Sequence, residues 1–151
     1  MMGDARAVSD LAEGQVVASV EIAASPERVF RALCSAEIVD WWVNPGVFDT
    51  REWTGDVRVG GQWRASGTSL RGPYTLQGKY VEVDPPRKLV HTWNDGVTAV
   101  STVIYLVEPI PQGTRLTVRH TDIATPDERS RITAGWRTSL DQLAAFLSPA
   151  T

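Results

Sequence analysis

Histidine is the side chain whose ordinary pKa lies closest to neutral pH, and this sequence has two of them, His91 and His120. In the segment 114–121, apolar and polar side chains alternate as in a half-buried strand, and His120 falls on the apolar face. In the segment 89–93, the same alternation groups His91 with Trp93. A half-buried strand turns its apolar face inward, so we expect both imidazoles to point into one interior cavity.

The segment between these two strands, Ala99–Val107, is apolar on both faces and is expected to form a strand that separates them. Neighbouring strands lie about 4.8 Å apart, so imidazoles on either side of a third strand would be at least about 9–10 Å apart. That distance is too long for a hydrogen bond between His91 and His120. Three roles stay open for them: cavity-wall residues bonded to a threonine or a water, contacts to the two ends of a ligand, or a base in acid–base catalysis.

Tryptophan is frequent in this sequence, with six residues against three tyrosines and three phenylalanines. Alternation places Trp63 and Trp93 on the inner face of strands, and the helical period places Trp136 on a helix that faces the sheet. Trp41 falls at the expected mouth of the cavity. Such indoles either fill the core or form the wall of an apolar pocket. The residues expected to line that pocket are Trp41, Trp63, Tyr80, His91, Trp93, Tyr105, His120 and Trp136.

Four carboxylates are the acidic candidates for chemistry, and for each we expect a surface position. Glu82 and Asp95 belong to turn regions, whereas Glu52 and Asp122 are nearer the expected cavity mouth. The single cysteine, Cys34, follows an apolar run, so we expect a small buried thiol without a disulfide partner.

Patterns that bind metals or cofactors do not occur in the sequence. Two histidines without neighbouring cysteines, and without a His-Glu-x-x-His pattern, do not match the spacing of a zinc site. Val59-Gly60-Gly61 lacks the glycine frame of a phosphate-binding loop. We therefore expect neither a metal nor a cofactor. The net charge of −3 argues against a nucleic-acid partner.

The length of 151 residues fits one domain. Residues 1–14 show no clear period and are expected to form a disordered tail before a single domain over residues 15–149. The longest apolar stretch, Val97–Val107, is too short to span a bilayer. Acidic residues interrupt the N-terminal segment where a signal peptide would need an apolar run, so a cytoplasmic location is expected.

Capping and turn signals divide the chain into elements. Ser25-Pro26-Glu27 is typical of a helix start, and Thr125-Pro126-Asp127-Glu128 is a capping box that opens a long helix ending near Leu147. A second short helix is expected from Ser35. Asn94-Asp95-Gly96 predicts a hairpin turn of type I′, because Asp-Gly tolerates the positive φ angles that this turn needs.

The order of these elements predicts an α+β fold. A strand over residues 16–23 and two short helices come first, and about six strands follow before the long C-terminal helix. The physical solution is an antiparallel sheet of about six to seven strands curled around that helix, with the two short helices at one end. A concave sheet around a helix tends to leave a cavity, because the two cannot touch along their whole length.

Seven short motifs occur in an order that is specific as a set: Ser25–Leu33, Asp40–Trp42, Asp56–Arg64, Gly78–Pro86, Leu89–Trp93, Gly113–Leu116, and Gly135–Trp136 ahead of Leu140 and Leu143. Through them the chain resembles the START-like, birch-pollen-allergen-like superfamily (SRPBCC). Within it, the chain is similar to the family named after the C-terminal domain of the activator of the heat-shock protein 90 ATPase. The resemblance implies a helix-grip fold. It leaves function open, because the superfamily includes lipid carriers, polyketide cyclases, ring-hydroxylase subunits and the co-chaperone itself.

Three functions are consistent with this sequence. The first is binding of a small hydrophobic molecule in a cavity between the sheet and the C-terminal helix. The second is a cyclase- or hydrolase-like enzyme that uses His91 or His120 as its base. The third is a co-chaperone-like protein-interaction module with an exposed apolar patch. The second apolar face of Ala99–Val107 is a candidate for such a patch, and it would suit a homodimer contact equally well.

Overall fold

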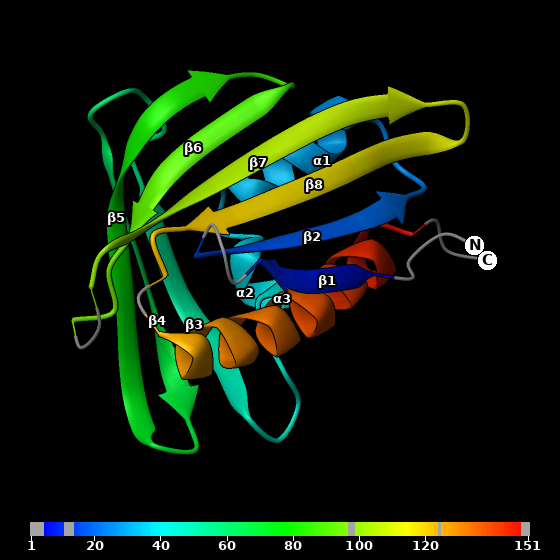
Figure 1. The fold of residues 1–151 in the computed structure, drawn as a ribbon. Coiled ribbons are helices and arrows are strands. Elements are labelled where there is room, and N and C mark those ends of the chain that lie inside the picture. The colour runs from blue at the N-terminus through cyan, green and yellow to red at the C-terminus, as the bar shows by residue number, and fades with distance from the viewer. Residues whose placement is uncertain (1–4, 11–13, 97–98, 124, 149–151) are drawn as a thin grey trace.

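The computed structural model describes residues 5–10, 14–96, 99–123 and 125–148, which form eight strands and three helices (Figure 1). In chain order these are β1 (Arg6–Asp10), β2 (Gln15–Ile22), α1 (Pro26–Leu33), α2 (Ile38–Trp41), β3 (Phe48–Gly55), β4 (Gln62–Ser69), β5 (Gly72–Asp84), β6 (Lys88–Trp93), β7 (Ser101–Ile110), β8 (Gly113–Thr121) and α3 (Pro126–Leu147). None of the helices in these ranges is both long and apolar enough to cross a lipid bilayer.

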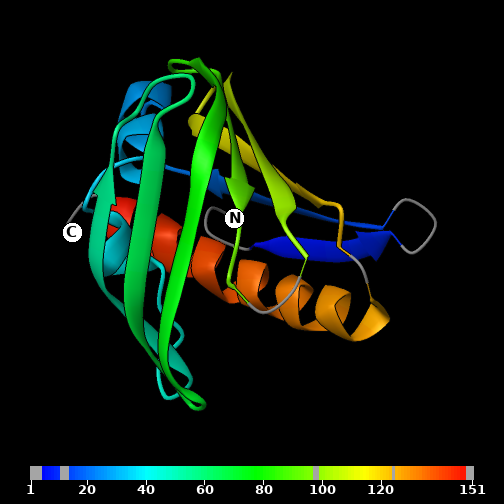
Figure 2. The same ribbon diagram turned by 90° about the vertical axis from the view of Figure 1, so that its left-hand side faces the viewer.

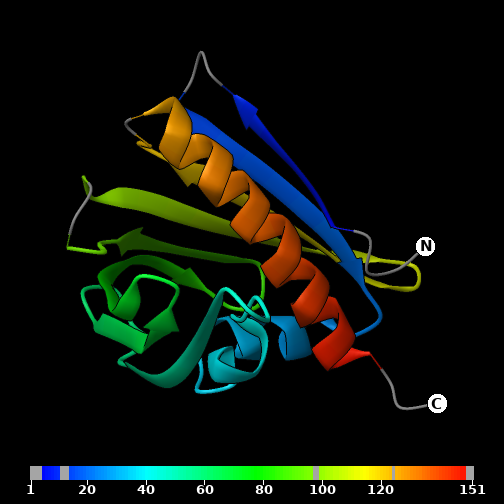
Figure 3. The same cartoon turned by 90° about the horizontal axis from the view of Figure 1, so that it is seen from below.

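The strands of the described residues form one antiparallel sheet in the order β1-β2-β8-β7-β6-β5-β4-β3. The sheet curls, and α3 lies along its concave side against β1 and β2 (Figure 2). Seen from below, α1 and α2 lie beside α3, and α2 also contacts β3 (Figure 3). The predicted α+β helix-grip arrangement is therefore confirmed.

Alternation along the strands separates a buried face from an outer face. Every second residue of β2 is buried, and β8 repeats this pattern. The register places Val16 of β2 opposite His120 of β8, and Val103 of β7 lies opposite His120 on the other side. All three side chains are fully buried. The sheet therefore turns His120 inward, as the alternation predicts.

Helix α3 begins and ends where the sequence predicts. The side-chain oxygen of Thr125 accepts a hydrogen bond from the backbone N–H of Glu128 at 3.2 Å, and Pro126 occupies the first turn. Its buried apolar residues recur at three- and four-residue steps. They are Trp136, Leu140, Leu143, Ala144 and Leu147. This stripe packs the helix into the concave side of the sheet.

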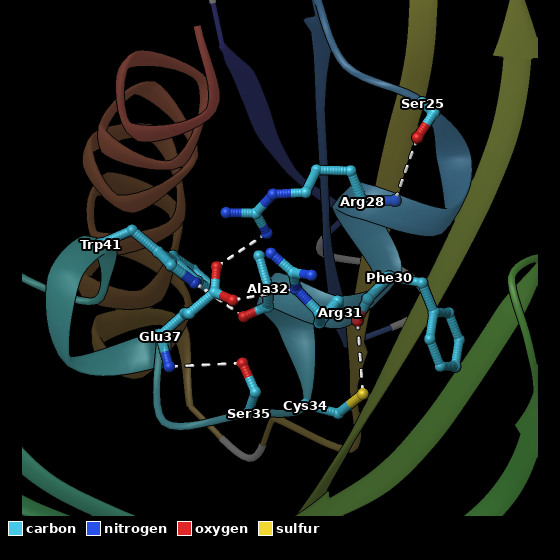
Figure 4. A network of polar contacts seen from close by, with 9 residues as sticks. All are labelled: Ser25, Arg28, Phe30, Arg31, Ala32, Cys34, Ser35, Glu37 and Trp41. Carbon is cyan, nitrogen blue, oxygen red and sulfur yellow. Dashed lines mark hydrogen bonds and ion pairs between the residues drawn. The ribbon is translucent and has the colours of Figure 1, made fainter.

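Polar contacts join α1 to α2, as Figure 4 shows. Glu37, which precedes α2, forms ion pairs with Arg28 and Arg31 at 2.7 and 3.1 Å. The indole N–H of Trp41 donates to the carbonyl oxygen of Ala32 at 2.9 Å. That carbonyl lies in the last turn of α1, where the helix itself supplies no partner. The side chain of Trp41 is only 1% exposed. Trp41 is thus buried in the core, whereas the sequence predicts a position at the mouth of the cavity.

The predicted N-terminal tail contains a strand. Arg6–Asp10 pairs with β2 as β1, which raises the strand number in the described ranges to eight, against the predicted six to seven. A strand of five residues carries too few alternating positions for a clear period. Its structure comes from pairing with the free edge of β2, which local sequence does not encode.

The connection between β6 and β7 is longer than the predicted type I′ turn. Trp93 pairs with Ser101, so residues 94–100 connect the strands, and 97–98 lie outside the described residues. Gly96 has a φ of 79°, and its backbone N–H donates to the side-chain oxygen of Asn94 at 2.8 Å. The positive φ at Gly96 was predicted correctly, but the turn is held by the asparagine side chain.

We predict opposite effects for two glycine-to-alanine substitutions. A Cβ at Gly67 would lie 2.0 Å from the backbone oxygen of Asp49, whereas a Cβ at Gly135 meets no heavy atom within 4 Å. Gly67→Ala should lower the free energy of unfolding by about 1–3 kcal/mol, because β3 would have to shift. Gly135→Ala should raise it by up to about 1 kcal/mol, because alanine favours the helix. Urea unfolding measures both, and equal effects would contradict this packing.

Candidate functional site

A cavity of about 230 Å³ lies between the N-terminal half of α3 and the concave side of the sheet, and we call it the α3 cavity. Most of its wall is apolar. The apolar lining residues are Trp42, Phe48, Leu76, Trp93, Ile123, Ile132 and Trp136. Ser101 and His120 are its neutral polar residues, and Asp95, Glu128 and Arg131 are its charged ones.

A second cavity of about 30 Å³ adjoins the first, and we call it the α2 cavity. It shares Trp42, Leu76 and Trp93 with the α3 cavity. Leu33 of α1 and Ile38 of α2 close one side of it. At about 30 Å³ against about 230 Å³, it is much the smaller of the two cavities.

The residues predicted to line one pocket are divided between these two cavities. Trp41, Trp63, Tyr80, His91 and Tyr105 line the α2 cavity, His120 and Trp136 line the α3 cavity, and Trp93 lines both. The ring of Trp93 lies 6.5 Å from that of His91 and 5.1 Å from that of His120, between ring centroids. The two histidines therefore line two adjoining cavities, and Trp93, which contacts both of their rings, lines both cavities. Ligand contact by these residues stays a prediction.

Both ring nitrogens of His120 have hydrogen-bond partners. The indole N–H of Trp136 donates to Nδ1 of His120 at 3.1 Å. An indole N–H can only donate, so Nδ1 must be the unprotonated nitrogen. The neutral ring then carries its proton on Nε2, which lies 2.7 Å from Oγ of Ser101 and donates to it. The partners thus assign the tautomer of His120.

Burial holds both histidines in the neutral form. It lowers the pKa of His120 to about 3, with a smaller effect from His91. It also lowers the pKa of His91 to about 4, partly opposed by the hydrogen bond between its Nδ1 and the carbonyl oxygen of Thr92 at 2.9 Å. Because that carbonyl can only accept, His91 carries its proton on Nδ1. Neither ring is protonated at neutral pH.

Three tryptophans pack together in the wall of the α3 cavity, and two of them, Trp42 and Trp93, also line the α2 cavity. Centroid distances are 5.4 Å between Trp42 and Trp93, 5.0 Å between Trp42 and Trp136, and 6.1 Å between Trp93 and Trp136.

The hydroxyl of Thr50 donates to the carbonyl oxygen of Trp42 at 2.6 Å. That hydroxyl has one proton, so Tyr74 must donate to Thr50 across their 2.6 Å contact. These bonds fix Trp42 against β3 and β5.

Reasoning from the sequence missed several residues of the α3 cavity, above all Ser101 and Gly135. Ser101 shares the buried face of β7 with Val103 and Tyr105, and it is the polar residue at the start of that face. A fixed register for this strand would have found it. An isolated glycine within a helical pattern is itself a signal of a packing or functional requirement, and Gly135 lines the cavity.

The four acidic candidates take different positions. Asp95 lines the α3 cavity, although its turn position predicts a solvated carboxylate. Glu52, Glu82 and Asp122 are exposed and line neither cavity. Glu52 and Asp122, which the sequence predicts near the cavity mouth, therefore do not belong to the wall of either cavity.

Cys34 is half-buried, and its thiol donates to the carbonyl oxygen of Phe30 at 3.3 Å. Burial raises the pKa of the Cys34 thiol to about 11, so the reactive thiolate is scarce at neutral pH. Within the described part of the chain, no three His, Cys, Asp or Glu side chains gather in a way that could hold a metal ion.

The neutral buried histidines predict a loss of stability in mild acid. Their folded pKa values, about 3 and about 4, lie below the unfolded value of about 6.5. Below about pH 6.5 the unfolded chain therefore takes up protons that the folded chain does not, and the loss ends near the folded pKa values. Each histidine should lower the free energy of unfolding by about 2 kcal/mol between pH 7 and pH 5.

Urea unfolding at pH 7, 6 and 5 measures this dependence. His91→Asn should remove about half of the slope, because one of the two proton-uptake sites is lost. Stability that stays constant between pH 7 and pH 5 would show that the histidines are protonated in the folded protein.

Residues 23–148 match the family described as "Activator of Hsp90 ATPase homolog 1-like protein". Comparison with curated proteins finds no match.

Solved structures with the same fold include proteins from three bacteria. A protein of Chromobacterium violaceum is 24% identical with a TM-score of 0.79, over 91% of this chain and 99% of that one. A protein of Mycobacterium smegmatis is 21% identical with a TM-score of 0.80, over 96% and 97%. The AHSA1 protein of Silicibacter pomeroyi is 27% identical with a TM-score of 0.73, over 88% and 96%. Since the family match spans most of its length, the chain belongs to the family of activator of Hsp90 ATPase homolog 1-like proteins.

Proposed function

We propose that this protein binds a small hydrophobic molecule in the α3 cavity. The observation that supports this most is the composition of the cavity wall, in which aromatic and aliphatic side chains surround one neutral polar pair, His120 and Ser101. Pockets with apolar walls and few polar groups are the usual sites for small organic ligands. Transfer of an apolar molecule from water into such a cavity is favourable in proportion to the area it buries.

The size of the cavity limits the ligand. A volume of about 230 Å³ is below the range of about 300–1,000 Å³ that is common for drug-sized ligands. We therefore infer a ligand of one or two rings. Arg131 is exposed, and Asp95 and Glu128 are half-buried, so the charged part of the lining is nearer to solvent than the indoles of Trp93 and Trp136.

Acid–base catalysis has less support than binding. Nε2 of His120 already carries the ring proton, so it cannot take the proton of the Ser101 hydroxyl. The proton cannot move to Nδ1 without loss of the hydrogen bond from Trp136, because the indole N–H can only donate. His91 lines the α2 cavity, whose volume of about 30 Å³ has no room for a substrate. A cyclase- or hydrolase-like role for either histidine would need a rearranged interior.

We predict that naphthalene and α-methylstyrene bind saturably. Titration followed by calorimetry, and by the NMR signals of the tryptophan indole N–H groups, measures their affinity. Gly135→Leu should weaken binding at least about tenfold, because a side chain at Gly135 enters unfilled space and takes up cavity volume. Thermal unfolding establishes that the variant is folded.

Leu70→Gln is the matched control for adsorption to the surface. Leu70 is 78% exposed and lines neither the α3 nor the α2 cavity. This variant should bind both probes like the unchanged protein. Non-saturable binding, or affinity that survives Gly135→Leu, would contradict a site in the α3 cavity.

A further inference from the structure

The hydrogen bonds around His120 run in one direction only. Trp136 is the start, because its indole N–H donates and has no lone pair with which to accept. His120 accepts on Nδ1 and, as a neutral ring, donates from Nε2. Ser101 must therefore use its oxygen as an acceptor toward His120. The order Trp136 to His120 to Ser101 is fixed by the first donor.

In this direction of the hydrogen bonds, the hydroxyl proton of Ser101 has no acceptor among the described residues. Its oxygen accepts from His120 at 2.7 Å, and among the described residues the structure records no second hydrogen bond of that oxygen. Ser101 is 5% exposed and lines the α3 cavity, next to Trp93 and His120. A buried hydroxyl proton that has no acceptor among the described residues is unfavourable, and an oxygen atom in the cavity, of a water or of a ligand, would satisfy it.

We propose that the ligand of the α3 cavity carries a hydrogen-bond acceptor oxygen, of the carbonyl kind, that takes the proton of the Ser101 hydroxyl. This inference rests on the proposed function, since it names the chemical class of ligand for the same cavity. The apolar wall of Trp42, Trp93 and Trp136 receives the hydrocarbon part of the molecule, and Ser101 orients its oxygen.

The same geometry disfavours a ligand that offers only a donor at this point. A ligand amine or amide N–H could donate to the second lone pair of the Ser101 oxygen, but it would leave the Ser101 hydroxyl proton without an acceptor. A hydrocarbon there would leave that proton unpaired. Ser101 therefore favours ligands with an acceptor oxygen, because a molecule that leaves its hydroxyl proton unpaired binds more weakly.

Acetophenone and α-methylstyrene form the test pair, because they have the same shape and differ in a carbonyl oxygen against a CH₂ group. Their dissociation constants are measured by calorimetry for the unchanged protein and for Ser101→Ala. The ketone loses the same hydration when it binds either protein, so this cost cancels in the comparison. The change in the ketone-to-alkene affinity ratio between the two proteins therefore reports the hydrogen bond from Ser101. The preference for the ketone over the alkene should fall about five- to tenfold in Ser101→Ala.

Ser139→Ala is the matched control. Ser139 is fully buried on α3 and lines neither the α3 nor the α2 cavity. Removal of its hydroxyl should leave the ketone-to-alkene ratio unchanged. A ratio that falls equally in both variants, or in neither, would overturn the role of Ser101.

Two measurements on the unchanged protein keep the test independent of the folding of Ser101→Ala. The infrared C=O stretch of bound, carbon-13-labelled acetophenone should lie below its frequency in an apolar solvent, because a hydrogen bond weakens the C=O bond. Nitrogen-15 NMR should show a protonated Nε2 and an unprotonated Nδ1 for His120. An unshifted stretch or the other tautomer would overturn the inference.

The failures of the two proposals are distinguishable. If α-methylstyrene binds saturably and acetophenone shows no Ser101-dependent preference, the cavity binds apolar molecules and the acceptor oxygen is wrong. If neither probe binds, both proposals fail.

Discussion

The hydrogen bond from Trp136 to His120 is the contact on which the chemistry of the α3 cavity depends. It joins α3 to β8 in a fully buried position, and it decides where the proton of His120 resides. A buried imidazole with an unpaired nitrogen would lose the hydration of that nitrogen without compensation. Both nitrogens of His120 are paired in the neutral form. Burial depresses the pKa of His120, so burial and hydrogen bonding favour the same neutral state.

The volume of the cavity comes from a mismatch between large and small side chains. Trp42 packs edge to face against both Trp93 and Trp136, and the rings of Trp93 and Trp136 are tilted against each other, so the three indoles support one another. Ser101 and Gly135 line the same cavity and contribute little volume. A core of aliphatic side chains of similar size packs as densely as an organic crystal. A core of that kind would leave no cavity of this size. The helix-grip fold supplies the concave sheet, but these side chains decide whether a site exists within it.

Local sequence predicts what depends on local physics. The cap at Thr125 defines the start of α3, and alternation along β8 turns His120 inward. Features decided by contacts between distant elements could not be predicted. The indole of Trp41 donates to a carbonyl in the last turn of α1, and the ring of Trp93 contacts the rings of both histidines. Neither the acceptor nor the ring orientation is encoded in the spacing of residues.

A serine and a histidine 2.7 Å apart also form the core of a hydrolytic site, so the partner on the far nitrogen decides which chemistry is open. In a catalytic serine–histidine pair, an acceptor such as a carboxylate holds a proton on Nδ1, which leaves Nε2 free to take the proton of the serine. Trp136 reverses this order, because it can only donate to Nδ1. The proton then lies on Nε2, the serine becomes a donor toward the cavity, and the same two side chains are suited to orienting a ligand and not to attacking it.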